Sequence, residues 1–247
     1  MRRSDTERTD IKAMAFPTLI YCANGNRRYA QIAIDAGYQY GAQLPGVVYH
    51  PVYFADQDWK KPNRMAYMAA LAEHHPTMAT VLDWEQEDQL NEVLDWAEAA
   101  AQYAERVLII PKVQGGISKL PRTINGKDVV LAYSVPTRYG GTALPLWDFA
   151  GWPVHLLGGS PEKQMKIYQH IAGITKYVSV DGNMHMKMAT QFCKFWRKQK
   201  GEKGHWVSLK ETGDGDFGKD ATYEAFRRSC HNIMAEWQAI EGLRVEA

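Results

Sequence analysis

Short apolar runs of strand length alternate with amphipathic segments along this chain. The runs cover residues 16–23, 40–44, 47–54, 78–82, 107–113, 129–135, 153–157 and 177–180. Between them, apolar residues spaced three and four apart predict helices, most clearly over residues 88–104. Proline and glycine interrupt residues 40–54, so the runs predict about seven strands, and residues 205–209 could supply an eighth. Nearly continuous apolar strands separated by helices are typical of parallel sheets that helices cover on both faces.

The pattern predicts an α/β protein with the architecture of a (β/α)8 TIM-type barrel. Residues 15–247 would form this single domain, and residues 1–14 a flexible amino-terminal tail. An open doubly wound parallel sheet is the alternative, because the order of the strands cannot be read from the sequence. In a barrel, the loops that follow the strands share one face, so polar residues at several strand ends are expected to meet in one site.

The composition is that of an ordinary globular protein, with 45% hydrophobic residues and a formal net charge of +1. The charge is unevenly placed, because residues 187–210 carry seven lysine or arginine residues against the single acid Glu202. Such a basic segment is typical of a surface that contacts nucleic-acid phosphates. The candidate contacts are Lys194, Arg197, Lys198 and Lys203. Three widely separated cysteines, and no apolar run near the roughly 18 residues that span a bilayer, indicate a cytoplasmic protein with no membrane partner.

Aspartates end several of the predicted strands, which is where α/β proteins place reactive groups. Asp181 closes the run 177–180 just before Gly182 and a Met-rich helix. An aspartate there can attack a sugar C1′ or stabilise a cation at that carbon, and the alternative is a helix-capping carboxylate. Asp56 and Asp58 follow another run, and either is a candidate general acid or base, with the other an ordinary turn residue.

Other strand ends offer groups that recognise a base or a phosphate. Asp83 can accept hydrogen bonds from purine-type N–H donors and Trp84 offers a ring face, unless both only begin the next helix. A glutamine amide reads donors and acceptors, and adjacent glycines admit a close approach. The base-binding candidates are therefore Asp83, Trp84, Gln114, Gly115 and Gly116. A phosphate or substrate loop is predicted at Arg138, Gly158, Gly159 and Ser160, although plain capping of the next helix explains the last three equally well.

No metal site and no cofactor are predicted. Cysteine and histidine side chains that can bind zinc occur in the last quarter of the chain, but their spacing matches no compact zinc motif. They are Cys193, His205, Cys230 and His231. The sequence also lacks a P-loop, a dinucleotide glycine fingerprint, a nucleophile elbow and a metalloprotease helix.

Five segments, taken in order, resemble the succession found in tRNA-guanine transglycosylases. They are Phe54–Asp56, the strand that ends at Asp83, Val113–Gly116, His155–Pro161 and Val178–Asp181. The chain is most similar to the short DNA-directed relatives that insert 7-deazaguanines, often encoded by phages and genomic islands, and the resemblance covers residues 54–189. It implies a barrel in which an aspartate attacks C1′ of a guanosine, guanine leaves, and a modified base is taken up in exchange.

The resemblance also implies a role for single residues. Asp181 would be the nucleophile, Asp56 or Asp58 the second acid or base, and Asp83 with Gln114 and the two following glycines the base pocket. The partners would be nucleic acid, DNA rather than tRNA, and a guanine or 7-deazaguanine base, in the host cytoplasm if a phage encodes the protein. The compact Cys/Cys/Cys/His zinc site of the tRNA enzymes has no counterpart in this sequence.

The sequence is therefore compatible with three classes of function. The first is exchange or removal of a base in nucleic acid, which the acids and the basic segment both favour. The second is a small-molecule barrel enzyme that acts on a nucleoside or sugar phosphate and uses the same acids without the basic segment. The third is a non-catalytic nucleic-acid-binding relative that kept the barrel, because a fold does not imply a function. If the basic segment lies on the rim of the face that holds Asp181, the nucleic-acid class is favoured. If it lies at the opposite end of the barrel, that class is contradicted.

Overall fold

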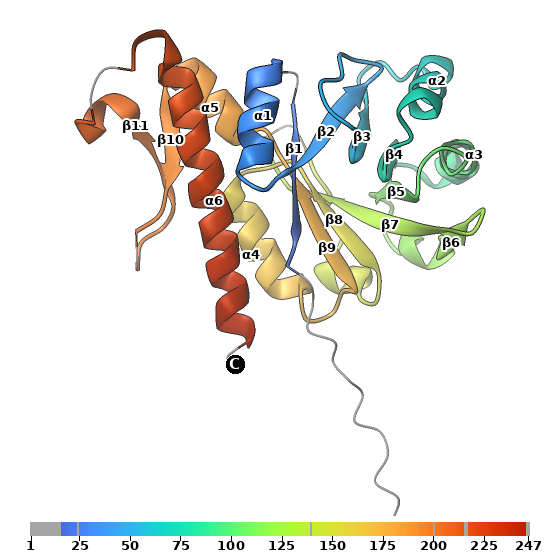
Figure 1. Cartoon of the computed structure of the whole chain (residues 1–247). Helices are drawn as coiled ribbons and strands as arrows, with labels where there is room; N and C mark the ends of the chain where they lie inside the picture. Colours follow the sequence, from blue (N-terminus) through green and yellow to red (C-terminus); the bar gives the residue numbers. More distant parts are fainter. Residues whose placement is uncertain (1–15, 24, 139, 200, 215–216, 246–247) are drawn as a thin grey trace, which may run out of the picture.

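Eight parallel strands close into a barrel in one α/β domain (Figure 1). The computed structural model describes residues 16–23, 25–138, 140–199, 201–214 and 217–245, so the predicted tail over residues 1–14 lies outside the described residues. The closed ring confirms the predicted barrel and excludes the open doubly wound sheet, because the last strand pairs with the first. Around the ring, the strands are β1 (Thr18–Cys22), β2 (Gln39–Leu44), β3 (Phe54–Gln57), β4 (Met78–Trp84), β5 (Arg106–Pro111), β7 (Lys127–Ser134), β8 (Pro153–Leu157) and β9 (Tyr177–Asp181).

Helices cover the outside of this barrel. They are α1 (Arg27–Asp35), α2 (Arg64–His74), α3 (Leu90–Ala100), α4 (Pro161–Ile171), α5 (Met184–Phe192) and the long α6 (Ala221–Val245), which packs against α1 and α5. Shorter elements complete the connections: η1 (Glu87–Gln89), η2 (Gly116–Lys119), β6 (Thr123–Ile124), η3 (Leu146–Phe149), η4 (Leu209–Thr212) and η5 (Gly218–Asp220). Across the described residues, every helix is too short or too polar to cross a membrane.

Alternation along the strands separates two apolar cores. Side chains that point inward, among them Ile20, Phe54 and Leu108, fill the barrel interior. Their neighbours along each strand point outward and pack beneath the helices. At the carboxyl ends of the strands, polar side chains such as Asp56 and Asp181 occupy the wall instead. The apolar interior therefore gives way to an open polar mouth at that end of the barrel.

Three predicted elements differ from the structure. Residues 47–53 form a loop, and the strand begins only at Phe54, which pairs with Gly41 of β2. Pro51 has no N–H to offer a sheet, which explains the late start. The helix predicted over residues 184–195 ends at Phe192, because Cys193 takes a left-handed conformation with φ of 49°.

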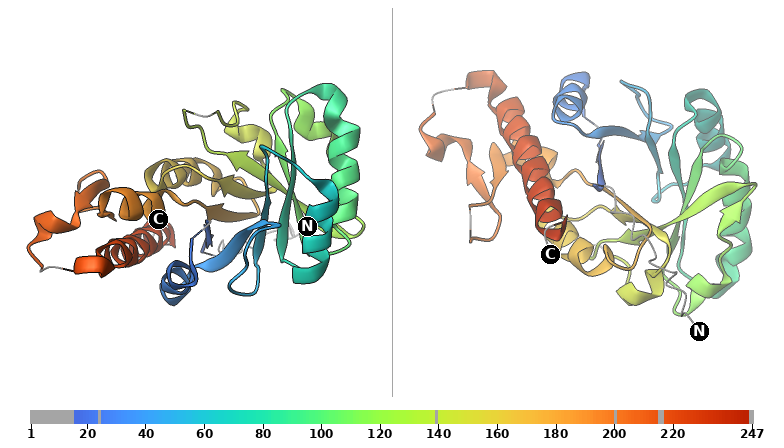
Figure 2. Two further views of the ribbon diagram at one scale, coloured as in Figure 1. Left: turned by 90° about the horizontal axis from the view of Figure 1, so that it is seen from above. Right: turned by 60° about the horizontal axis from the view of Figure 1, so that its bottom comes forward.

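The candidate eighth strand at residues 205–209 lies outside the barrel. Its residues form β11 (His205–Ser208), which pairs antiparallel with β10 (Lys194–Arg197) in a separate two-stranded sheet. The barrel needs no strand from this region, because residues 39–57 supply two. Figure 2 shows the β10–β11 hairpin on the outer side of α6, away from the barrel strands.

Candidate active site

A cavity of about 340 Å³ opens at the carboxyl ends of the barrel strands, within the size range of small-molecule sites. We call it the mouth. β3 contributes Asp56, β4 contributes Asp83 and β9 contributes Asp181 to its wall. Gly158 and Gly159, which follow β8, complete this part of the wall. The barrel therefore brings together three predicted acids and half of the predicted substrate loop.

Asp181 is tightly held, with only 10% of its side chain exposed. Its Oδ1 accepts a hydrogen bond from the N–H of Gly158 at 2.9 Å and lies 3.1 Å from Nε2 of the buried His155. Nδ1 of His155 lies 2.9 Å from Oγ of Ser179, and the imidazole stacks on Phe54. A neutral imidazole with its proton on Nε2 satisfies both contacts. Oδ2 of Asp181 makes no hydrogen bond to any described residue, so it is available to a substrate.

The backbone around Asp181 is fixed by the loop after β8. Nε2 of Gln164 donates to the carbonyl oxygens of Asp181 and of Gly158. Gly159 has φ of 87°, and a Cβ there would lie 2.5 Å from Cγ1 of Val135, so only glycine fits this close approach. The N–H of Gly158 serves Asp181 in this arrangement, whereas the sequence suggested a phosphate as its partner.

Asp56 is the second acid of the mouth. Its Oδ1 accepts a hydrogen bond from the hydroxyl of Thr80 at 3.2 Å. Burial, and then the nearby charge of Asp181, raise the pKa of Asp56 from 3.8 to about 7, against the opposing effect of the Thr80 hydrogen bond. Asp58 lies outside the mouth wall, and its Oδ1 accepts from the N–H of Lys60 at 3.1 Å as an ordinary turn residue does. Of the two candidate acids, the structure puts Asp56 in the mouth.

Asp83 faces the mouth, but the neighbouring Trp84 does not. Nζ of Lys112 lies 2.6 Å from Oδ2 of Asp83 and 2.7 Å from Oε1 of Glu85, so an ion pair fixes the aspartate. Trp84 is fully buried in the outer core, and its Nε1 donates to the carbonyl of Gln86. Successive strand residues point to opposite faces, so an inward Asp83 turns Trp84 outward. The prediction that Trp84 offers its ring to a base is wrong.

The remaining base-binding candidates also lie outside the mouth. Gln114 and Gly115 are exposed and line a separate depression beside Arg122. Gly116 lies against the ring of Trp84, where a Cβ would come within 2.7 Å of Cη2. This glycine is therefore needed for packing in the core, and the barrel does not bring these three residues into the mouth with Asp83.

Two members of the predicted substrate loop lie outside the mouth wall as well. Arg138 is exposed, and its neighbours Thr137 and Gly140 line the mouth in its place. Ser160 is the N-cap residue of α4, as the capping alternative predicts, although its side chain makes no capping hydrogen bond. Gly158 and Gly159 are the members of this loop that reach the mouth.

The four candidate nucleic-acid contacts belong to the β10–β11 hairpin and its turn. Lys194 and Arg197 lie in β10, and Lys198 and Lys203 follow in the turn. Lys198 forms an ion pair with Glu236 of α6. None of the four lines the mouth, and the hairpin lies on the far side of α6 from the barrel strands (Figures 1 and 2). A nucleic acid in the mouth would reach these residues only by extending past α6.

Three residues of the site were not predicted from the sequence. Gln57 is 3% exposed, lines the mouth, and its buried Oε1 has no hydrogen-bond partner among the described residues. Trp59, with 59% of its surface exposed, lines the same cavity. His155 holds Asp181, and a histidine in the middle of an apolar strand was the signal for it. The signal for Gln57 and Trp59 was their place directly after Asp56.

The described residues contain no group of three or more His, Cys, Asp or Glu side chains arranged to hold a metal ion. Cys22, Cys193 and Cys230 are free thiols. Cys22 lines the mouth, where burial and then the charges of Asp56 and Asp181 raise the pKa of its thiol well above the usual value. It is therefore a neutral thiol at physiological pH and a poor nucleophile.

Comparison with known proteins supplies a family and no activity. A family model described as a family of unknown function (DUF6610) matches residues 33–238, a range that includes Asp56, Asp83 and Asp181. A search of curated proteins found no match. A function can therefore be inferred only from the geometry of the mouth.

Proposed function

This chain belongs to the DUF6610 family, and from the geometry of its mouth we propose that it exchanges or removes a guanine-type base in nucleic acid. The observation that carries the proposal is the pair of carboxylates in the mouth. Oδ1 of Asp181 accepts from the N–H of Gly158 and lies 3.1 Å from Nε2 of His155, whereas burial raises the pKa of Asp56 to about 7. Two neighbouring carboxyl groups with different environments are what cleavage of a glycosidic bond requires, one as nucleophile and one as acid.

The reaction follows from these two roles. Oδ2 of Asp181 attacks C1′ of the nucleotide, the bond from C1′ to the base breaks, and Asp56 gives its proton to the departing base. In the second half, Asp56 takes a proton from an incoming base or from water, the nitrogen or oxygen that loses this proton bonds to C1′, and the ester between Asp181 and C1′ breaks to release the carboxylate. His155 and Gly158 hold the other oxygen of Asp181 and so orient the nucleophile. The resemblance to tRNA-guanine transglycosylases supports the same reaction.

The base would be held by Asp83 and Trp59. A guanine edge offers N–H donors, which the carboxylate of Asp83 can accept. The exposed ring of Trp59 offers a face for stacking. Trp59 thus takes the role that the sequence assigned to Trp84.

Replacing Asp83 by alanine should weaken the binding of 7-deazaguanine about 10- to 100-fold, because an unpaired donor costs about 1–3 kcal/mol. The binding of adenine should change much less, since its edge presents a different order of donors and acceptors. Isothermal titration with both bases measures the difference. Glu87→Ala removes an acid that pairs with Lys119 outside the mouth and serves as the control. An equal loss for both bases would remove Asp83 from the base pocket.

The basic hairpin would contact phosphates of a nucleic acid that extends beyond the mouth. Replacing Lys194, Arg197 and Lys203 by glutamine should weaken DNA binding and lower the slope of log affinity against log salt by about one for each lost contact. Lys198 is left in place because it pairs with Glu236. The control replaces Lys127 and Lys176, which lie at or just before the amino-terminal ends of strands. An unchanged slope would assign the hairpin to plain solvated surface.

A small-molecule enzyme acting on a nucleoside or sugar phosphate is the second candidate. It is favoured by the distance of the basic hairpin from the mouth, which a small substrate would not need. Gly158 and Gly159 also follow the seventh strand of the barrel, a common phosphate position in this fold. This candidate uses the same two carboxylates and differs in its substrate.

One assay separates the two candidates. The protein is incubated with labelled guanine or 7-deazaguanine and, in parallel, with double-stranded DNA, single-stranded DNA, tRNA or guanosine 5′-phosphate. Label should enter a polynucleotide, and unlabelled guanine should be released from it. Label that enters only the mononucleotide would favour the small-molecule enzyme, and no exchange or base release with any substrate would contradict both candidates.

A further inference from the structure

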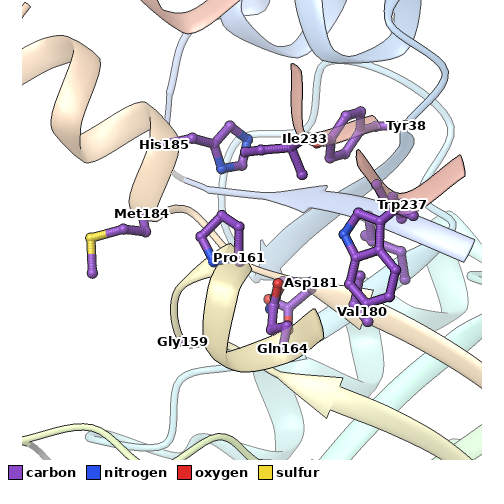
Figure 3. Close-up of a pocket in the computed structure, with 13 residues that line it drawn as sticks. Tyr38, Gly159, Pro161, Gln164, Val180, Asp181, Met184, His185, Ile233 and Trp237 are labelled. Carbon is purple, nitrogen blue, oxygen red and sulfur yellow. The ribbon is translucent and has the colours of Figure 1, made fainter. Parts of the chain in front are cut away.

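A second cavity lies behind Asp181, between the strands β1 and β9 and the helices α4, α5 and α6 (Figure 3). Its space is small, about 20 Å³. Asp181, Gly159 and Gly182 line both this cavity and the mouth, so they form the wall between the two. We call it the rear cavity.

Three buried polar atoms in the wall of the rear cavity have no hydrogen-bond partner among the described residues. They are Oη of Tyr38, Nε2 of His185 and Nε1 of Trp237. The three residues are 6%, 4% and 0% exposed, and they come from the segment before β2, from α5 and from α6. Figure 3 shows their rings around one space, with His185 across from Tyr38 and Trp237. Leaving a buried polar group unpaired costs about 1–3 kcal/mol, so three around one space indicate a shared ligand.

The chemistry of the three atoms defines what this ligand must offer. The indole N–H of Trp237 only donates, so the ligand needs an acceptor. His185 stacks on Phe226 at 5.1 Å, and burial lowers the pKa of its imidazole to about 4, so the ring is neutral and Nε2 can accept. The hydroxyl of Tyr38 can donate or accept. The ligand therefore carries at least one donor and one acceptor.

Size then restricts the ligand to a single small molecule. A cavity needs roughly 10–15 Å³ of such space to hold one water molecule, and the rear cavity offers about 20 Å³. Buried water typically makes about three hydrogen bonds, which is the number of atoms that need one here. A hydrocarbon would leave all three unpaired. A cation could not accept from the N–H of Trp237, and an anion would lie beside the carboxylate of Asp181, which lines the same cavity.

We propose that the rear cavity binds one water molecule, which accepts from Trp237, donates to His185 and exchanges a hydrogen bond with Tyr38. This water joins α6, α5 and the segment before β2 directly behind the strand end that carries Asp181. The site does not depend on the reaction proposed for the mouth, since its evidence is burial, volume and unpaired polar atoms.

Water contacts of the indole Hε1 proton of Trp237 test the proposal in solution. In deuterated, ¹⁵N-labelled protein, this proton should show a cross-peak to water in both NOESY and ROESY spectra, with the opposite signs that mark a long-lived water. Trp237→Phe assigns the resonance by removing it. The control is the equally buried Trp84, whose Nε1 already donates to Gln86 at 2.8 Å and which should show no such cross-peak.

A second variant excludes the main alternative source of the signal. The hydroxyl proton of Tyr38 exchanges with water and would relay a cross-peak to Trp237 without any buried water. In Tyr38→Phe the cross-peak should persist, because Trp237 and His185 still hold the molecule. Loss of the cross-peak in Tyr38→Phe, or its absence in the unaltered protein, would overturn the proposal and leave the rear cavity dry. Neither result bears on the exchange assay, so the two proposals fail independently.

Discussion

Replacing Asp181 by asparagine is expected to lower base exchange by about 10⁴-fold or more while the barrel stays folded. The amide oxygen of asparagine can still accept from the N–H of Gly158 and from His155, so the local hydrogen bonds survive. The nucleophilic charge is lost, and with it the bond to C1′. Single-turnover exchange of labelled base measures the loss, and circular dichroism checks the fold.

The matched control is Asp128→Asn, which makes the same change at the amino-terminal end of β7, far from the mouth wall. It should exchange base as the unaltered protein does. Turnover within about tenfold of normal in Asp181→Asn would remove Asp181 from the role of nucleophile. The alternative that Asp181 is only a capping carboxylate would then stand.

Replacing Asp56 by asparagine should lower turnover about 10²- to 10⁴-fold, the usual effect of a general acid. Burial raises the pKa of Asp56 to about 7, so the unaltered protein should lose activity in its first half-reaction as the pH rises above 7. Asp56→Asn should lose this alkaline limb of the pH profile along with most of its rate. Asp58→Asn is the control, because Asp58 belongs to the adjacent turn. This substitution should change neither the turnover rate nor the alkaline limb of the pH profile.

The raised pKa of Asp56 also predicts how the free energy of unfolding depends on pH. The pKa of Asp56 is about 7 in the folded protein and 3.8 without burial, so the folded state binds the extra proton between these values. Its contribution to stability is fully present below pH 3.8 and is lost as the pH rises through about 7. Asp56→Asn should therefore gain stability relative to the unaltered protein between pH 5 and pH 8 in urea unfolding. A constant difference across this range would contradict the raised pKa.

The period of the apolar runs was enough to predict the barrel and most of its elements. The run 153–157 is β8 to the residue, and the strand ends carrying Asp56, Asp83 and Asp181 meet in one cavity as a barrel requires. The barrel could be predicted because nearly continuous apolar strands with helices between them have few stable arrangements. The position of an acid at the end of a strand then fixes the face on which it lies.

Side-chain direction at the ends of strands could not be read in the same way. Asp83 and Trp84 were predicted as a pair, yet adjacent strand residues face opposite sides, and the register between β4 and β5 shifts between Thr80 and Asp83. The sequence does not reveal such a shift. Gln114 and the glycines after it follow a strand too, but Gly116 packs against the ring of Trp84. Packing between distant segments decided these positions.

The position of the basic segment could not be predicted from the sequence either. Its charge is evident from the sequence, but the hairpin that carries it pairs β10 with β11 and lies outside α6. Nothing in the local pattern indicates which end of the barrel such an appended hairpin adjoins. The contact between Lys198 and Glu236, separated by 38 residues, is likewise set by the packing of α6.

The most direct test of the proposed reaction is to detect the bond between Asp181 and C1′ during turnover. The protein is mixed with a guanine-containing oligonucleotide, quenched in acid within milliseconds to seconds, digested and examined by mass spectrometry. We expect a peptide containing Asp181 that carries the oligonucleotide less one guanine, and we expect no such peptide from Asp181→Asn. Exchange of base with the added mass on another residue, or undiminished exchange by Asp181→Asn, would contradict the proposed reaction.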